Sequence, residues 1–503
     1  MSEESDRSAA VRYRFPPLER RGVIAGWRAG QVGSVAAGLV LAVLCVRSRP
    51  SLAGVAVAVV LVGAGVAAAF WPVAGRTGDQ WLPVVIRWGW AGATARRIQR
   101  HGGPSAGVSL SFDARTGTDV IRREGGPPAP PRAVFDGLRL VGAPGTGIGV
   151  VVDDRARTVT AVLLVQGHSF ALLGPVEQGA RVAGWARVLA SLARDGSSVH
   201  RLQWVETCLP DDGGAVRTHL VDHGVLADDD AASRSYRQLL DEASPVTRRH
   251  RVLIAVTVHR GRAARAIRSA GGGLDGALDV LAREVGAVHT SLEGVDVGVD
   301  GVLDRAGVAG VLAEAFRPAP DGTGDVAGAP GAAGEPWPMG TGAGWDAVRT
   351  DGTWHATYWV AEWPRVDVQP DFLGPLLFAP LRRTLSVVME PVEPTRAARQ
   401  VAQARTAGLA DGELRRRNGF LTSARHTRER QSVDERDVEL ADGHAQFRYS
   451  GYLGVTADSR AELEASCASL EQAAGQARLE VRRLYGQQDV ALLCLLPLGR
   501  GLS

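Results

Sequence analysis

The chain lacks lysine altogether: all 57 of its basic residues are arginine. Within these 503 residues, this absence excludes a P-loop lysine, a Schiff-base lysine and a lysine general base. Cysteine is scarce as well, because Cys45, Cys208, Cys467 and Cys494 lie far apart and form no CxxC pair. Such spacing is typical of a reducing compartment and provides no zinc motif. The net charge of +3 is too small to indicate nucleic acid as a partner.

Two uncharged apolar runs stand out, residues 29–46 and 52–70, with only RSRPS between them. A helix rises 1.5 Å per residue, so about 20 residues cross a hydrocarbon core of about 30 Å. A signal peptide fits less well, because the first run begins 28 residues into the chain and a second run follows at once. Two buried core helices in tandem with so few polar positions would be unusual. We therefore predict a transmembrane helical hairpin.

Charged and aromatic residues flank the two runs asymmetrically. Arginine is frequent before the first run and after the second, whereas only Arg47 and Arg49 lie between the runs. By the positive-inside rule, both termini face the cytoplasm of a multi-pass protein in the plasma membrane. Tryptophans occur where the membrane interfaces are expected. The residues concerned are Arg12, Arg14, Arg20, Arg21, Arg28, Arg76, Arg87, Arg96, Arg97 and Arg100, with Trp27, Trp71, Trp81, Trp88 and Trp90.

The fold class predicted for the whole chain is a transmembrane hairpin followed by a cytoplasmic α+β region. That region is expected to form two lobes of mixed or antiparallel sheet with packed helices. The predicted divisions are a cytoplasmic N-terminal segment 1–28, the hairpin 29–74, an interfacial helix and linker 75–103, a first lobe 104–317, a Pro/Gly/Ala-rich linker 318–344 and a second lobe 345–503.

Patterns within the lobes predict individual elements. Two β-branched runs in residues 148–165 flank a polar turn and predict a β-hairpin. Helical spacing predicts helices over 177–193, 228–243, near 274–285 and over 302–316, and a long helical stretch over 395–435. A weak internal echo relates 248–261 to 382–395, because each places an arginine pair before a strand and a helix after it.

The glycine-rich stretch 142–149 (GAPGTGIG) has the glycine spacing of a phosphate-binding loop. However, Ile148 and Gly149 occupy the positions of the lysine and the hydroxyl residue, and a strand follows where a helix is required. The stretch does not fit a dinucleotide-binding fingerprint either, because such a fingerprint must be followed by a helix. We interpret the stretch as the turn of a hairpin.

Other candidate sites are weaker. His219 and His223 have the i, i+4 spacing of two metal ligands but lack a suitable carboxylate partner and lie among loop residues. Asp228, Asp229 and Asp230 are better explained as the start of a helix. The arginine-rich stretch 415–430 could contact acidic partners, lipid headgroups or nucleic acid, although a solvated helix face explains it more simply. No catalytic, cofactor-binding or metal-binding residue is predicted.

Two family resemblances go beyond these patterns. The N-terminal hairpin and the GRT…QWLP stretch after it resemble PrgI-type membrane proteins of conjugative type IV secretion systems. Residues 159–210, 235–258 and the closing LEVRRLYGQQDVALLCLLPLGRG are similar to the N-terminal lobe of the conjugation traffic ATPase, in an actinobacterial family that joins the two. The second resemblance is to EccE-type components of type VII secretion, which also join two spans to a cytoplasmic α/β domain. Residues 147–167 carry that resemblance.

The type IV resemblance implies a membrane-anchored, non-enzymatic adaptor that docks a separately encoded P-loop ATPase. The remaining expected partners are other membrane components of the apparatus, membrane lipids and further copies of the chain. No cofactor is expected. An EccE-like core component is the first alternative. The second is a membrane-tethered enzyme that binds nucleotide or lipid, and DNA contact by residues 415–430 stays open.

Overall fold

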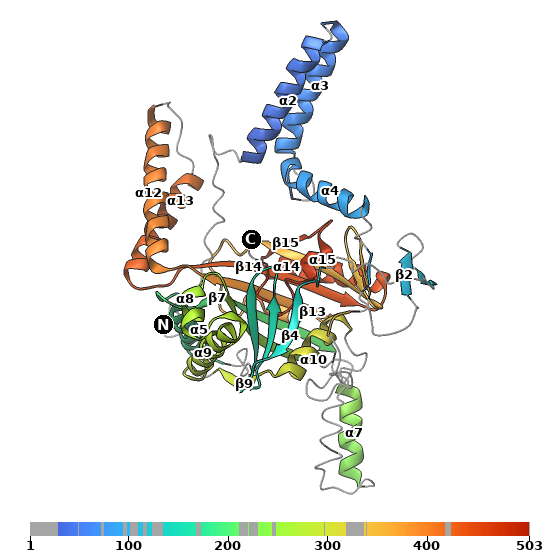
Figure 1. Cartoon of the computed structure of the whole chain (residues 1–503), viewed down its shortest axis with the longest axis vertical. Helices are drawn as coiled ribbons and strands as arrows, with labels where there is room; N and C mark the ends of the chain where they lie inside the picture. The colour runs from blue at the N-terminus through green and yellow to red at the C-terminus, as the bar shows by residue number, and fades with distance from the viewer. Residues whose placement is uncertain are drawn as a thin grey trace, which may run out of the picture.

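The structure is a computed structural model that describes residues 29–48, 50–71, 75–93, 98–100, 109–113, 118–122, 134–166, 173–210, 220, 230–243, 248–295, 297–317, 336–338, 340–417 and 424–501. Two apolar helices project from a region built around one large antiparallel sheet with helices packed on it (Figure 1). This architecture confirms the predicted fold class. The predicted segment 1–28, with Trp27 and its arginines, lies outside the described residues.

The apolar hairpin consists of α2 (Ala29–Ser48) and α3 (Leu52–Phe70). Ser51 caps α3 by accepting a hydrogen bond from the Gly54 amide at 3.1 Å. The helices approach closely at Gly38 and Gly65, because a Cβ added to Gly65 would lie 3.2 Å from the Gly38 Cα. Most apolar side chains point outward, with Leu52 92% exposed. Length and composition allow both helices to cross a membrane, and a lipid environment would cover this surface.

The main sheet has 13 strands, and its order along the main path is β1-β10-β11-β12-β14-β13-β7-β8-β6-β5-β4. In addition, β9 pairs with β6 and β15 pairs with β12, while β2 and β3 form a separate two-stranded sheet. The bounds are β1 (Ile98–Arg100), β2 (Ser109–Asp113), β3 (Thr118–Arg122), β4 (Leu138–Gly142), β5 (Gly149–Asp153), β6 (Thr158–Gln166), β7 (Val199–Pro210), β8 (Arg248–His259), β9 (Gly298–Val302), β10 (Gly340–Ala343), β11 (Val348–Thr350), β12 (Thr353–Glu362), β13 (Arg383–Pro391), β14 (Phe447–Ala457) and β15 (Glu480–Arg483).

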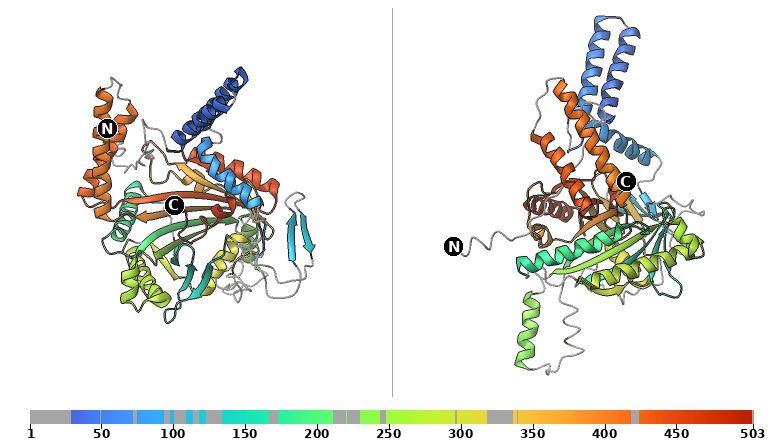
Figure 2. Two further views of the ribbon diagram at one scale, coloured as in Figure 1. Left: turned by 45° about the horizontal axis from the view of Figure 1, so that its top comes forward. Right: turned by 90° about the vertical axis from the view of Figure 1, so that its left-hand side faces the viewer.

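Helices cover both faces of the sheet (Figure 2). Alternate strand residues face opposite sides, so Ile254 packs under α5 and α9 while its neighbour Leu253 packs under α10 and α15. On the first face, the cores under α9 and α14 meet at Trp204 and Val387. The helices beyond the membrane hairpin are α4 (Gly78–Ala93), α5 (Pro175–Leu192), α7 (Ala231–Ala243), α8 (Ala264–Ser269), α9 (Gly273–Glu293), α10 (Arg305–Phe316), α11 (Gly374–Leu377), α12 (Pro394–Arg417), α13 (Ala424–Ala441), α14 (Arg460–Gln476) and α15 (Gln488–Leu492).

The two halves of the sheet repeat one topology. The order β4-β5-β6-β8-β7 in the first half matches β10-β11-β12-β14-β13 in the second, and β7 and β13 pair to join the halves. Helices α5, α9 and α10 occupy the same places in the chain order as α11, α14 and α15. Strands β9 and β15 pair with equivalent strands, β6 and β12. The lobes are therefore two copies of one topology in a continuous sheet.

Three sequence predictions need correction. Residues 340–343 of the expected linker form β10 and belong to the main sheet, whereas 318–335 and 339 lie outside the described residues. The internal echo pairs β8 with β13, but the topology makes β14 the counterpart of β8. The helix predicted near 274–285 extends to Glu293 because apolar residues continue at helical spacing through Val288 and Leu292, which are buried.

Candidate functional site: the joint between the membrane hairpin and the sheet

Helix α4 connects the membrane hairpin to the sheet and lies within the segment where the sequence predicts an interfacial helix. Its beginning packs against the end of α3, because a Cβ added to Gly78 would lie 2.8 Å from the Ala68 carbonyl oxygen. Gln31 of α2 donates a hydrogen bond to the Ala69 carbonyl at 3.0 Å, which fixes the base of the hairpin. The path from the spans to the sheet therefore consists of packed helices.

One face of α4 enters an aromatic cluster on the sheet. Trp81, Val84 and Trp88 recur at helical spacing, and Val84 is buried. The Trp81 ring stacks on Trp345 with centroids 5.8 Å apart, and Trp88 meets Trp345 edge to face at 5.5 Å. Tyr485 stacks on Trp345 at 6.5 Å and also lies 6.3 Å from the Trp81 ring, so these three rings contact one another. We call this cluster, Trp81, Val84, Trp88, Trp345 and Tyr485, the joint.

The backbone around the joint is shaped for this packing. Gly486 has a φ of +68°, and an added Cβ would lie 2.7 Å from the Trp345 ring and 2.9 Å from Val84. Its amide donates to the Trp345 carbonyl at 2.6 Å, tying the β10–β11 turn to the segment after β15. Arg482 donates to the Gly75 carbonyl at 2.6 Å, and Arg87 of α4 lies 3.5 Å from Asp489.

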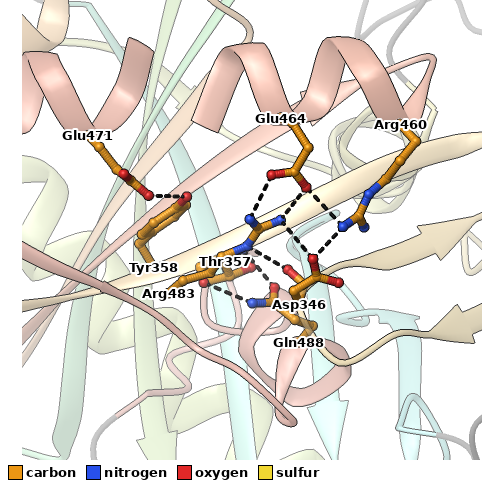
Figure 3. Close-up of polar contacts among 8 residues, drawn as sticks. All are labelled: Asp346, Thr357, Tyr358, Arg460, Glu464, Glu471, Arg483 and Gln488. Atoms are coloured by element: carbon orange, nitrogen blue, oxygen red, sulfur yellow. Dashed lines mark hydrogen bonds and ion pairs between the residues drawn. The ribbon is translucent and has the colours of Figure 1, made fainter. Parts of the chain in front are cut away.

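An ionic network holds Asp346, the residue that follows Trp345 of the joint (Figure 3). Arg483 donates to both carboxylate oxygens of Glu464 at 3.1 and 3.0 Å and to the Asp346 carbonyl at 2.7 Å. Arg460 contacts the carboxylates of Asp346 and Glu464 from α14. The hydrogen bonds from Arg483 hold the pKa of Glu464 below its ordinary value. The network ties the residue after Trp345 to α14 and β15.

Two further hydrogen-bonded pairs extend this support into the sheet. The side chain of Gln488 accepts from the Thr357 amide at 2.8 Å and donates to the Thr357 carbonyl at 3.2 Å (Figure 3). Tyr358 donates to Glu471 of α14 at 2.8 Å. Helix α4 thus rests on residues that are themselves held by β12, α14 and α15.

A second buried polar centre lies where the two halves of the sheet meet. Arg383 of β13 is fully buried and forms a bidentate ion pair with Glu206 of β7, which also bonds His250 at 2.7 Å. Burial alone would raise the pKa of Glu206, but His250 and Arg383 hold it below its ordinary value. Nearby, Gln203 donates to the Leu496 carbonyl at 2.9 Å and accepts from the Gly499 amide at 2.7 Å. The C-terminal segment therefore crosses and closes the junction.

The glycine-rich stretch 142–149 forms the turn between β4 and β5, as the sequence interpretation predicts. Gly145 and Gly147 have positive φ values, and the Ala143 amide donates to the Ile148 carbonyl at 2.8 Å. No helix follows this turn, so its amides are not arranged for phosphate binding.

The remaining sequence candidates are not brought together. His219, His223, Asp228 and Asp229 lie outside the described residues, whereas Asp230 immediately precedes α7. Of the arginine-rich stretch 415–430, residues 415–417 end α12 and residues 424–430 begin α13, away from the joint, while 418–423 lie outside the described residues (Figure 1). Trp81 and Trp88 pack in the joint, while Trp71 and Trp90 stay exposed.

The cysteines are free thiols in the structure, and three of them are buried. Burial raises the pKa of Cys208 and Cys467, and raises that of Cys494 to about 12, so these thiols stay protonated and unreactive. Among the described residues, no group of three or more metal-ligating side chains converges. A cavity beside His355 and Arg383 encloses about 40 Å³, room for a few waters and too little for a nucleotide.

Residues 246–360 match the family model of EccE, described as a putative type VII ESX secretion system translocon. The matched segment runs from β8 to β12 and contains Trp345 and Asp346 of the joint and its support. No curated protein matches the chain. The chain is thus similar to a membrane component of a secretion system, and this match supports the EccE resemblance rather than the PrgI-type one.

Sequence reasoning missed the joint. The seven-residue spacing of Trp81 and Trp88 could have indicated a packed helix face, since it places both rings on one side of α4. Trp345 and Tyr485 carry no local signal of their role, because their partners lie far away in the sequence.

Proposed function

We propose that this protein is a non-enzymatic membrane component of a type VII-like bacterial secretion apparatus. Its hairpin lies in the plasma membrane, and its doubled sheet forms a cytoplasmic platform for other components, including a separately encoded P-loop ATPase. The observation that carries the proposal is the EccE match over residues 246–360. The type IV interpretation shares the adaptor role but lacks such a match.

The joint suggests how the platform works. Association of several copies or partners requires each platform to hold a defined angle to the membrane, and packed aromatic side chains supply such a constraint. Trp345 stands between α4 and the sheet, and Arg483 and Arg460 hold the turn that carries it. A flexible linker in place of α4 would leave the platform free to rotate.

A scaffold role also agrees with the chemistry of the described residues. The buried ionic groups of Arg383 and Glu206 neutralise each other, and the cavity that Arg383 lines has about 40 Å³. They stabilise the junction between the halves and offer no space to a substrate.

Copurification tests the proposal directly. The full chain, tagged at its C-terminus and produced in its native host, is extracted from membranes in a mild detergent. We expect a large complex that contains a P-loop ATPase and further membrane proteins of a type VII system. Recovery of the chain alone, or with conjugation proteins, would contradict the type VII assignment.

A pair of variants tests the role of the joint. Trp345→Ala removes the central ring, whereas Trp363→Ala removes a ring that packs on Tyr449 at 5.8 Å, away from α4. We expect Trp345→Ala to reach the membrane normally but to reduce secretion by about tenfold, the effect of about 1.4 kcal/mol on assembly. Trp363→Ala should secrete at the unmodified level, and equal defects in both variants would argue against a specific joint.

The orientation needs its own experiment, since it follows from the arginine distribution alone. A cysteine introduced at Ser51, between the two spans, should react with a membrane-impermeant maleimide in intact cells, in a Cys45→Ser background. Arg268→Cys, at an exposed position of α8 on the cytoplasmic platform, should react only after the cells are opened. The reverse pattern would invert the topology.

A further inference from the structure

The helical hairpin α12–α13 leaves the sheet on the same side as the membrane hairpin. In Figures 1 and 2, its free end rises beyond α4, to the height of the lower part of α2 and α3. Helix α12 has 24 residues and is therefore about 36 Å long at 1.5 Å per residue. A projection of this length extends well away from the sheet, on the side from which α2 and α3 also leave it.

The root of the hairpin is fixed, and the outer part projects freely into its surroundings. Ala397 and Val401, in the first turns of α12, are buried against the rest of the protein. Farther out, Arg405 of α12 pairs with Asp437 of α13 at 2.9 Å, and Leu409 is 58% exposed. The two helices thus form an arm that is anchored at one end.

Charge is sharply divided along this arm. Residues 413–430 contain six arginines and two glutamates, a net charge of +4, whereas the rest of the arm, residues 394–412 and 431–442, contains four arginines and six acidic residues, a net charge of −2. The positive part lies at the free end, where α12 ends at Arg417 and α13 begins at Ala424. We call this end the basic tip and define it by Arg415, Arg416, Arg417, Arg425, Arg428 and Arg430.

A uniformly solvated arm would have no reason to separate its charges in this way. The division places cations next to the membrane and anions away from it, which suits a negatively charged surface at the free end. Each arginine near such a surface contributes to binding, and the attraction falls off within about 10 Å at 0.1 M salt.

We propose that the basic tip binds the anionic phosphate surface of the same membrane that α2 and α3 cross. This second contact, on a different part of the platform from α4, fixes the rotation of the sheet about the membrane hairpin. The proposal rests on the insertion of α2 and α3 that the proposed function assumes.

The test uses the full chain in lipid nanodiscs, made of phosphatidylcholine alone or with about 30% phosphatidylglycerol to imitate an anionic leaflet. A fluorophore on Thr427→Cys, in a Cys45→Ser background, reports contact with a headgroup spin label, since Thr427 is exposed and the other cysteines are buried. We expect at least threefold stronger quenching in the anionic discs, lost at 0.5 M NaCl.

Two triple variants separate local charge from total charge. Arg415→Gln, Arg416→Gln and Arg417→Gln remove charge at the tip and should reduce quenching in anionic discs to the neutral level. Arg265→Gln, Arg268→Gln and Arg305→Gln remove the same charge from exposed positions on α8 and α10, away from the membrane hairpin (Figure 1), and should leave quenching unchanged.

Several outcomes would overturn the proposal. Equal quenching in neutral and anionic discs would exclude an electrostatic contact, and no quenching in either would exclude any contact. Preferential binding of a short DNA duplex by the tip, with release from anionic discs, would assign the charge to nucleic acid. A chain that fails to coelute with discs would refute the membrane insertion itself, a result separate from failure of the tip.

Discussion

The two halves of the sheet share one topology but differ in the helices that are inserted between equivalent strands. Between β7 and β8 the first half inserts α7, whereas between the equivalent strands β13 and β14 the second half inserts the α12–α13 hairpin. Because β7 and β13 are antiparallel neighbours, their carboxyl ends lie at opposite ends of the sheet. The two insertions therefore project in opposite directions, α7 away from the membrane hairpin and α12–α13 along it (Figure 1). Antiparallel joining of two similar units has given the platform a membrane side and an opposite side.

A second pair of equivalent positions shows the same divergence. The β4–β5 turn of the first half corresponds to the β10–β11 turn of the second, which carries Trp345. In the first half, Gly149 donates to the Leu303 carbonyl at 2.9 Å and lies against the start of α10. In the second, Gly486 before α15 donates to the Trp345 carbonyl. Both turns are tied to the segment before the last helix, but only the second holds α4.

The largest effect is expected at the junction of the halves. Arg383→Met leaves the Glu206 carboxylate buried without its cation, which should lower the free energy of unfolding by about 3–5 kcal/mol. The neighbouring Arg382→Met removes a pair with exposed Asp458 inside the second half and should cost less than about 1 kcal/mol. Chemical denaturation of the detergent-solubilised chain measures both. Equal losses of unfolding free energy in the two variants would show that the ion pair at the junction stabilises the protein no more than the exposed pair inside the second half.

The next test compares the equivalent turns. In Gly149→Ala, the new Cβ would lie 2.4 Å from the Asp304 carbonyl oxygen, a backbone clash that should cost about 1–3 kcal/mol in global stability. Gly486→Ala should instead loosen α4, seen as faster proteolysis between the spans and the sheet, because its Cβ would displace Trp345. Gly142→Ala, with open space around its Cβ, serves as control. Loss of global stability without loosening of α4 in Gly486→Ala would contradict the joint.

Acid should weaken the second half through His355. This imidazole is fully buried between Thr350 at 2.6 Å and Thr456 at 3.0 Å, and burial lowers its pKa to about 4 from 6.5. Its neutral form stabilises the fold fully above pH 6.5, and this contribution is lost as the pH falls toward 4, by up to about 1.4 kcal/mol per pH unit.

The matched variant for this pH dependence is His355→Gln, which keeps a hydrogen-bonding side chain that does not titrate. Unfolding free energies at pH 7, 6 and 5 should fall less steeply in the variant than in the unmodified chain. Some slope should remain, because burial beside Arg201 and Arg262 also lowers the pKa of His200 to about 4. Parallel pH profiles of the variant and the unmodified chain would show that the pKa of His355 is the same in the folded and the unfolded state.

The smallest effect is expected in the glycine-rich turn of the first half. Thr146→Ala removes one hydrogen bond of 3.4 Å to the Ala143 carbonyl and should change stability by less than about 0.5 kcal/mol. Mg-ATP at 1 mM should not raise the melting temperature of either protein, because the turn offers no helix N-terminus to phosphate. A melting shift that Thr146→Ala abolishes would revive the nucleotide-binding alternative.

The sequence predicted correctly those features that depend on residues close together in the chain, and it missed those that depend on contacts between distant residues. The strands on either side of the polar turn at residues 153–157 were predicted correctly, because their β-branched runs and the turn are local signals. The internal echo was wrong because an arginine pair before a strand does not specify which neighbours that strand pairs with. The joint was missed because its rings come from α4, from the β10–β11 turn and from the segment after β15, which lie far apart in the chain.

The sequence alone predicted two apolar helices long enough to cross a membrane, since an uncharged run of this length can satisfy its backbone in lipid only as a helix. It also excluded chemistry that requires lysine. Only the tertiary structure decided that two similar halves form one sheet, that Trp345 holds α4, and that α12–α13 leaves the sheet on the same side as α2 and α3. These features depend on strand pairing and on contacts between residues hundreds of positions apart, which local patterns do not encode.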